Sequence, residues 1–169
     1  MAQMPIRFFR KRMFLRSFMP MALMTHPSAG WQIRPYRRDD HVSLESLFLD
    51  CLVDFPWRGN KADETVRLRQ AIRTGPCLVA EEKMAGLIGF LTLETANAYV
   101  PHLFVDRDWR LCGVGGGLLE VARDLARSPL QLDVDLQNKG AIRAYRALGW
   151  SEKVNARPSR PDQTRLAGP

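Results

Sequence analysis

A glycine cluster, Gly113, Gly115 and Gly116, constrains the fold of this chain more than any other feature. The residues before it, 99–105, form an apolar run typical of a strand, and the residues after it have the spacing of an amphipathic helix. The first N–H groups of a helix lack intrahelical partners and lie at the positive end of the helix dipole. Because glycine has no Cβ, a ligand can approach this backbone closely. The pattern therefore predicts a strand, a turn and a helix start that can bind an anion, most often a phosphate.

Two common phosphate-binding motifs do not fit this cluster. A dinucleotide fingerprint needs a glycine at the sixth position, which is Leu118 when counted from Gly113. A nucleoside triphosphate loop ends in Gly-Lys-Ser or Gly-Lys-Thr, and neither triplet occurs in the chain. What remains is Arg110-x-x-Gly113-x-Gly115 between a strand and a helix. A glycine-rich turn that binds no ligand stays open as the alternative.

Hydrophobic periodicity predicts alternating helices and strands along the rest of the chain. Helices are expected over residues 44–55, 63–72, 114–125 and 139–148. Strands are expected over residues 32–36, 77–81, 87–93, 98–105 and 130–136, with residues 150–155 as a candidate last strand. Asp39 or Asp40 is placed to cap the first helix. Polar residues alternate with leucine and valine over 130–136, so one face of this strand should look into a cleft or solvent.

A second motif begins where that strand ends. It reads Asn138-x-x-Ala141-x-x-x-Tyr145-x-x-x-Gly149-Trp150 and lies on a predicted helix. With both motifs in this order, residues 32–155 resemble the GNAT superfamily of N-acetyltransferases. The resemblance implies an α/β fold with a mixed, mostly antiparallel central sheet, flanked by helices, whose central strands splay apart. It also implies that acetyl-CoA, the acyl-donor cosubstrate, binds between those strands.

The resemblance carries roles over to individual residues. The backbone of Val105 would bond the pantetheine arm, Asn138 would contact the same arm, and Tyr145 would reach the thioester sulfur. The pyrophosphate would be held by the loop, with Arg110 adding a cation to the N–H groups of Arg110, Leu111, Cys112, Gly113, Val114, Gly115 and Gly116. Tyrosine titrates near pH 10, so Tyr145 can protonate the leaving thiolate as general acid. Without the motif, Tyr145 would be interpreted as a core aromatic.

One departure from the family lies in the loop itself. Many members carry basic or small residues after the motif arginine, whereas this chain has Leu111 and Cys112. The loop keeps its backbone donors but loses side-chain charge. We therefore expect ordinary or weaker CoA affinity, with binding retained.

The acceptor side is less defined. An amine must lose a proton before it attacks a thioester, and Glu94, Tyr99, His102 or water could accept that proton. Residues 55–57, Phe-Pro-Trp, correspond to the family's acceptor-side wall, or else form an ordinary helix terminator. The expected activity is acetyl transfer to a primary amine of a small molecule, peptide or protein, by direct attack in a ternary complex. A non-catalytic acyl-CoA-binding or sensing module with the same fold is the alternative.

Charge and composition divide the chain into three segments. Residues 1–30 are expected to be a basic, poorly ordered extension, residues 31–155 the acetyltransferase domain, and residues 156–169 a loose tail. Residues 1–38 hold eight Lys and Arg and no Asp or Glu, so the rest of the chain, with 17 basic and 18 acidic residues, is nearly neutral. This distribution argues against a nucleic-acid-binding domain. The extension has the composition of a membrane-surface or targeting helix, but an upstream start with Met21 or Met24 as initiator is favoured.

Metal binding and disulfides are not expected. Three cysteines (Cys51, Cys77 and Cys112) and three histidines (His26, His41 and His102) show no metal-ligand spacing. Unpaired cysteines are typical of a reduced, cytoplasmic setting. No membrane partner is expected for the folded domain, and the sequence leaves open whether the chain forms a homodimer.

Overall fold

The computed structural model describes residues 24–25 and 30–169 of the chain. The described strands are β1 (Met24–Thr25), β2 (Trp31–Pro35), β3 (Cys77–Glu82), β4 (Gly86–Glu94), β5 (Tyr99–Val105), β6 (Gln131–Asp135), β7 (Ser151–Glu152) and β8 (Gln163–Ala167). The helices are α1 (His41–Leu52), α2 (Lys61–Thr74), α3 (Val114–Ala126) and α4 (Lys139–Ala147), with 3-10 turns η1 (Arg38–Asp40) and η2 (Arg107–Trp109). Within this part of the chain, no helix is long and apolar enough to cross a membrane.

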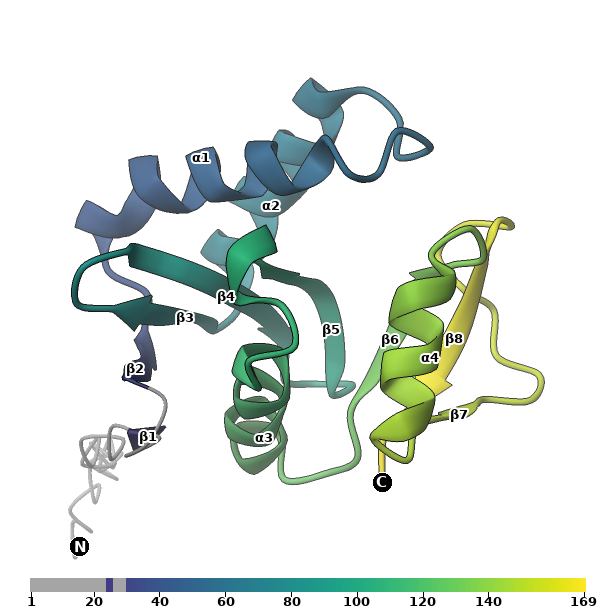
Figure 1. Cartoon of the computed structure of the whole chain (residues 1–169). Coiled ribbons are helices and arrows are strands. Elements are labelled where there is room, and N and C mark those ends of the chain that lie inside the picture. The colour runs from purple at the N-terminus through teal and green to yellow at the C-terminus, as the bar shows by residue number, and fades with distance from the viewer. Residues whose placement is uncertain (1–23, 26–29) are drawn as a thin grey trace, which may run out of the picture.

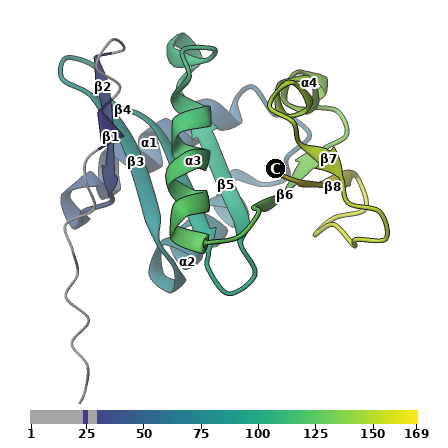
Figure 2. The same cartoon turned by 90° about the horizontal axis from the view of Figure 1, so that it is seen from below.

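The strands form one mixed sheet in the order β1-β2-β3-β4-β5-β6-β8-β7 (Figure 1). All neighbouring pairs are antiparallel except β5 and β6, which are parallel. Two apolar clusters cover its two faces. One joins the strands to α3 and α4, and the other joins them to α1 and α2 (Figure 2). The predicted mixed, mostly antiparallel sheet flanked by helices is confirmed.

The two central strands meet at one end only. A single residue pair, Tyr99 with Gln131, joins β5 to β6, and the strands then diverge (Figure 1). A β-bulge precedes the divergence, because β4 pairs Glu94 with Tyr99 but Thr92 with His102, which leaves one extra residue in β5. The bulge contains Pro101, which has no N–H to give to a neighbouring strand. The predicted splay of the central strands is thus confirmed and has a local cause.

The bulge also changes which way β5 faces. Val100 packs in the cluster with α3, whereas His102 and Phe104 contact Phe48 of α1. Beyond the bulge, the Asp106 N–H donates to a β4 carbonyl at 2.9 Å. Because backbone groups alternate along a strand, those of Leu103 and Val105 are directed away from β4 and toward the gap beside β6.

The C-terminal segment corrects two sequence predictions. Residues 156–169 are not a loose tail, because residues 163–167 form β8, which pairs with β6 on one side and β7 on the other. Leu166 is completely buried between them. The candidate last strand over 150–155 is reduced to the two residues of β7. Of the basic extension predicted over 1–30, only Met24, Thr25 and Gly30 lie within the described residues.

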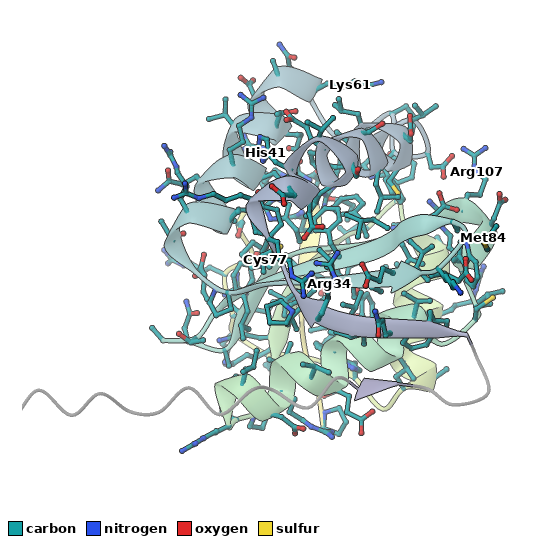
Figure 3. The ribbon with its side chains drawn as sticks, turned by 90° about the vertical axis from the view of Figure 1, so that its left-hand side faces the viewer. Arg34, His41, Lys61, Cys77, Met84 and Arg107 are labelled. Carbon is teal, nitrogen blue, oxygen red and sulfur yellow. The ribbon has the colours of Figure 1, made fainter. Side chains whose placement is uncertain are left out.

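The start of α1 also differs from expectation. Asp40 precedes the helix, but its carboxylate does not cap it. The two oxygens instead accept a two-pronged hydrogen bond from the guanidinium of Arg34 on β2, at 2.7 and 2.8 Å (Arg34 is labelled in Figure 3). Hydrogen bonding from Arg34 holds the pKa of Asp40 below its usual range. The pair ties the first helix to the sheet.

Gly117 is required for packing and not for ligand approach. A Cβ at this position would lie 2.9 Å from the Trp31 ring and 3.1 Å from Ile33. We expect Gly117→Ala to destabilise the fold by about 1–3 kcal/mol through overpacking. At roughly 2–4 °C per kcal/mol for a chain of this size, thermal unfolding should shift down by several degrees. Gly116→Ala is the control, because no atom lies within 4 Å of its Cβ position. A melting temperature that rises in Gly117→Ala would contradict this account.

Candidate active site

The glycine loop connects the open end of β5 to α3. Gly113 precedes the helix with a φ of 82°, a left-handed conformation that favours glycine. Leu111 also has a positive φ, of 65°, and its side chain is fully exposed. The first helical hydrogen bond is donated by the Gly117 N–H to the Gly113 carbonyl, at 2.9 Å. The N–H groups of Val114, Gly115 and Gly116 therefore have no partner within the helix.

Room for a ligand exists over this first turn. A Cβ on Gly115 would meet only Val105 Cγ2, at 3.7 Å, and a Cβ on Gly116 would meet nothing within 4 Å. Earlier in the loop, the N–H groups of Arg110 and Cys112 donate to turn carbonyls at 3.4 Å each. The donors best placed for an anion are consequently those of the α3 first turn, at the positive end of its dipole.

Arg110 is held in place by the loop that follows α1. Its Nη2 lies 2.8 Å from Asp54 Oδ2, and its Nε donates to the Val105 carbonyl at 3.2 Å. Asp54 also pairs with Arg107, which Figure 3 labels at the edge of the molecule. Hydrogen bonding from Arg107 and Arg110 holds the pKa of Asp54 below its usual range. The carbonyl of Val105 and the charge of Arg110 are thus both engaged within the protein.

A cavity of about 80 Å³ lies between the diverging strands. It is lined by Phe55, Arg58, Val100, Pro101, Leu103, Phe104, Leu132, Asp133, Val134, Asp135, Asn138, Ala141 and Tyr145. Tyr145 comes from α4, and its ring packs against Trp150 with centroids 5.3 Å apart. Its hydroxyl takes part in no hydrogen bond with the residues that the structure describes. Burial raises the pKa of Tyr145 above its ordinary value, so the hydroxyl keeps its proton at neutral pH.

Asn138, which lines this cavity, also has a structural role. As the residue before α4, its Oδ1 accepts a hydrogen bond from the Ala141 N–H at 3.1 Å. The amide nitrogen donates to none of the described residues. Asn138 therefore fixes the start of the helix that carries Tyr145 and keeps donors available at the cavity.

The three residues considered as general bases do not line this cavity. Glu94 is exposed and accepts from Asn97 at 3.2 Å. The Tyr99 hydroxyl donates to Asp133 at 3.0 Å. His102 is buried, hydrogen-bonds Thr92 at 2.9 Å, and has a pKa lowered to about 3 by burial and by nearby Arg58 and Arg67. His102 is accordingly a core residue on the α1 side of the sheet.

Two carboxylates of β6, Asp133 and Asp135, line the cavity instead, together with the apolar Leu132 and Val134 of the same strand. Asp133 accepts hydrogen bonds from Tyr99, Ser159 and Arg165. Burial acts to raise the pKa of Asp133, but these partners hold it below its ordinary value. Asp133 is therefore ionised and saturated with donors at neutral pH.

Asp135 has cationic partners from two other parts of the chain. Its Oδ2 lies 3.0 Å from Arg58 Nε, and its Oδ1 lies 2.6 Å from Arg160 Nη2. Burial acts to raise the pKa of Asp135, yet Arg58 leads the contacts that hold it below its ordinary value. Sequence reasoning missed these contacts, because the partners are remote in sequence from β6. In the sequence, the only sign of them is the alternation of aspartates along the strand.

The described residues offer no metal site beside this cavity. Within 24–25 and 30–169, no group of three or more His, Cys, Asp or Glu side chains could hold a metal ion. Cys51 and Cys77 are buried free thiols, and Cys112 is exposed. The features that could act on a substrate are the glycine loop, the cavity between β5 and β6, and Tyr145.

The sequence is similar to known acetyltransferases over most of its length. The model of the Acetyltransferase (GNAT) family matches residues 41–150, which is more than half of the chain. The chain is 29% identical over 128 residues to the peptidyl-lysine N-acetyltransferase YjaB of Escherichia coli, covering 74% of this chain and 84% of that protein. It is 40% identical over 60 residues to an uncharacterized N-acetyltransferase of Methanocaldococcus jannaschii, but those residues are only 26% of that relative.

Solved structures share the fold. The apo form of E. coli YjaB superposes with a TM-score of 0.64 at 25% identity, covering 82% of this chain and 97% of that one. A yncA protein from Salmonella typhimurium, solved with its cofactor acetyl-CoA, superposes with a TM-score of 0.62 at 19% identity, covering 82% and 92%. On the family match, the chain belongs to the GNAT family and is an acetyltransferase.

Proposed function

We propose that the protein transfers an acetyl group from acetyl-CoA to a primary amine by direct attack in a ternary complex. The observation that carries this proposal is the alignment of three features at the gap between β5 and β6. The uncapped first turn of α3 begins at the open end of this gap. The cavity lies within the gap, and Tyr145 lines the cavity. In this interpretation the α3 N–H groups bind the pyrophosphate. The N–H of Val105 and the side chain of Asn138 face the pantetheine arm, while the Val105 carbonyl already accepts from Arg110.

The proposed reaction needs two proton movements. The neutral amine attacks the thioester carbonyl carbon, the C–S bond breaks, and the nitrogen gives up a proton. The Tyr145 hydroxyl, protonated because its pKa is raised, supplies a proton to the departing sulfur. The amine's proton passes through water and restores the Tyr145 hydroxyl, because hydrogen bonds and ion pairs already occupy both cavity carboxylates.

Peptide lysines are the first acceptors to test, because the relative YjaB is named a peptidyl-lysine N-acetyltransferase. Thiol release from acetyl-CoA, followed across lysine peptides and small amines, tests the proposal directly. Release that depends on an amine, with acetylated product detected by mass, supports it. Tight CoA binding without release for any amine would favour the non-catalytic acyl-CoA-binding module.

The pH dependence of kcat/KM should reflect the titration of the acceptor amine and not that of a group on the enzyme. Asp133 and Asp135 have lowered pKa values and Tyr145 a raised one, so none of them changes charge near neutrality. With a lysine peptide, kcat/KM should rise about tenfold per pH unit between roughly pH 6 and 9, because the amine titrates near pH 10.4. Glu94→Gln is the control and should leave the profile unchanged. A plateau near pH 7 in the wild type would instead reveal a general base.

A further inference from the structure

The open end of the gap between β5 and β6 is spanned by side chains. The strands are joined by backbone pairing only at Tyr99 and Gln131. At the other end, the loop after α1 and the end of β6 are connected through ion pairs. Four side chains linked to one another by ion pairs, Arg58, Glu64, Asp135 and Arg160, connect the two sides at this end, and we call them the brace.

The brace joins two parts of the molecule that the gap separates. Arg58 and Glu64 belong to the loop and helix α2 on the β5 side, while Asp135 and Arg160 belong to β6 and the β7–β8 loop. Arg58 lies 3.0 Å from Asp135, and Arg160 lies 3.7 Å from Glu64, so both connections cross the gap. Gln163 adds a hydrogen bond to Asp135 at 2.8 Å.

Stability alone does not account for these charges. The side chains of Glu64 and Asp135 are 5% and 3% exposed, so both carboxylates have lost nearly all of their hydration. Replacing a buried ion pair by packed apolar residues is often neutral or stabilising, because desolvation offsets the attraction. What the pairs do supply is a fixed geometry between the groups they join. Here they join the two walls of the cavity, which Arg58, Asp135 and Tyr145 all line.

We propose that the brace sets the separation of β5 and β6 at the open end, and so aligns the thioester with Tyr145. Arg58 and Asp135 are then positioning residues for acetyl transfer. The guanidinium of Arg58, 5.3 Å from the Phe104 ring centroid, also lines the cavity, and its bulk there should favour the small acetyl group over longer acyl chains. This inference rests on the proposed function, since it assumes that acetyl-CoA lies between the two strands.

The test replaces both members of the main pair. In Arg58→Met/Asp135→Leu, Glu64 keeps Arg67 and Arg160 as partners, whereas Arg160 and Gln163 each lose a bond to Asp135. The variant should therefore melt below the wild type but above Asp135→Ala, which leaves the buried charge of Arg58 without Asp135. Turnover of acetyl-CoA should still fall on the order of 10- to 100-fold, because a misplacement of about 1 Å costs that much. The preference for acetyl-CoA over butyryl-CoA should narrow as well. Asp135→Ala alone should lose both stability and turnover.

A matched pair of controls separates positioning from packing. Arg69→Met/Glu45→Leu removes an ion pair between α1 and α2 that lies away from the cavity, and both turnover and acyl preference should stay at wild-type values. If Arg58→Met/Asp135→Leu restores stability relative to Asp135→Ala and also restores turnover, the brace is only structural and the proposal is overturned.

A distance measurement tests whether the brace sets the separation of the two strands, and it does not depend on catalytic activity. Nitroxide labels at the exposed positions Val66 on α2 and Arg143 on α4, in a Cys112→Ser background, report the separation of the two halves by pulsed electron paramagnetic resonance. The double variant should broaden or shift the distance distribution, and an unchanged distribution would refute the brace. If the wild type neither binds CoA nor transfers acetyl, the proposed function fails while this measurement still judges the brace.

Discussion

Gly115→Glu should lower the affinity for CoA by at least about 100-fold. The substitution places a carboxylate at the first turn of α3, where the proposed pyrophosphate would lie. Two like charges about 4 Å apart near a protein surface repel by roughly 4 kcal/mol, and 1.4 kcal/mol corresponds to a factor of 10. Calorimetric titration of the variant with CoA measures the loss. An unchanged affinity would remove the pyrophosphate from this loop.

The variant should fold, which makes the binding result interpretable. The Cβ of residue 115 would meet only Val105 Cγ2, at an ordinary 3.7 Å. An acidic residue in the first turn of a helix also interacts favourably with the helix dipole, so the melting temperature should be unchanged or slightly higher. Gly115→Gln is the matched control, with equal bulk and no charge. Only the Glu variant should recover affinity as salt rises, because salt screens the repulsion.

Local patterns in the sequence predict most of the elements, because a helix or strand with one buried face repeats its apolar residues at a fixed period. Leu44, Leu47, Phe48, Cys51 and Leu52, which predict the first helix, are all buried in α1. The strands β3 to β6 lie where alternation or apolar runs predict them. Long-range pairing carries no such local signal. For this reason the sequence predicts a loose tail where β8 lies, since Leu166 is the only fully buried side chain of that strand.

The splay has a sequence signal that periodicity alone does not use. Pro101 lies inside the apolar run, and a proline within a strand indicates an edge or a bulge. Its consequence depends on the register with β4, which only the structure gives. The brace is harder still to predict. Its four residues, at positions 58, 64, 135 and 160, resemble ordinary surface charges in the sequence until the fold brings them together.

The direction of a side chain in the fold also decides whether a general-base candidate can reach the cavity. Glu94, Tyr99 and His102 flank or belong to a central strand, which makes them candidates in the sequence, but their side chains are directed to other partners. His102 illustrates the physical reason. The bulge at Pro101 turns it toward Phe48, where the ring centroids lie 5.9 Å apart, on the α1 side of the sheet. A strand without the bulge would alternate differently from that point onward.

Tyr145→Phe should lower kcat by a factor within or somewhat below the 10²–10⁴ range typical of general acid–base groups. The phenylalanine ring keeps the contact with Trp150 and the packing of α4, and it removes only the hydroxyl. That hydroxyl bonds to none of the described residues, so its removal leaves no buried partner unsatisfied and the melting temperature should change little. The KM for acetyl-CoA should also change little, because the proposed contact forms as the sulfur departs.

Two features determine how far kcat falls in Tyr145→Phe. A thiolate with a pKa near that of cysteine, about 8.5, is already a tolerable leaving group, so part of the effect can be masked. Burial raises the pKa of Tyr145, which keeps the donor protonated throughout the usual assay range, so no alkaline limb near neutrality should come from it. The measurement is steady-state kinetics over pH with an active amine, under conditions where the chemical step limits turnover. If Tyr145→Phe then turns over at the wild-type rate, Tyr145 is a packing residue and the proton must come from water or another donor.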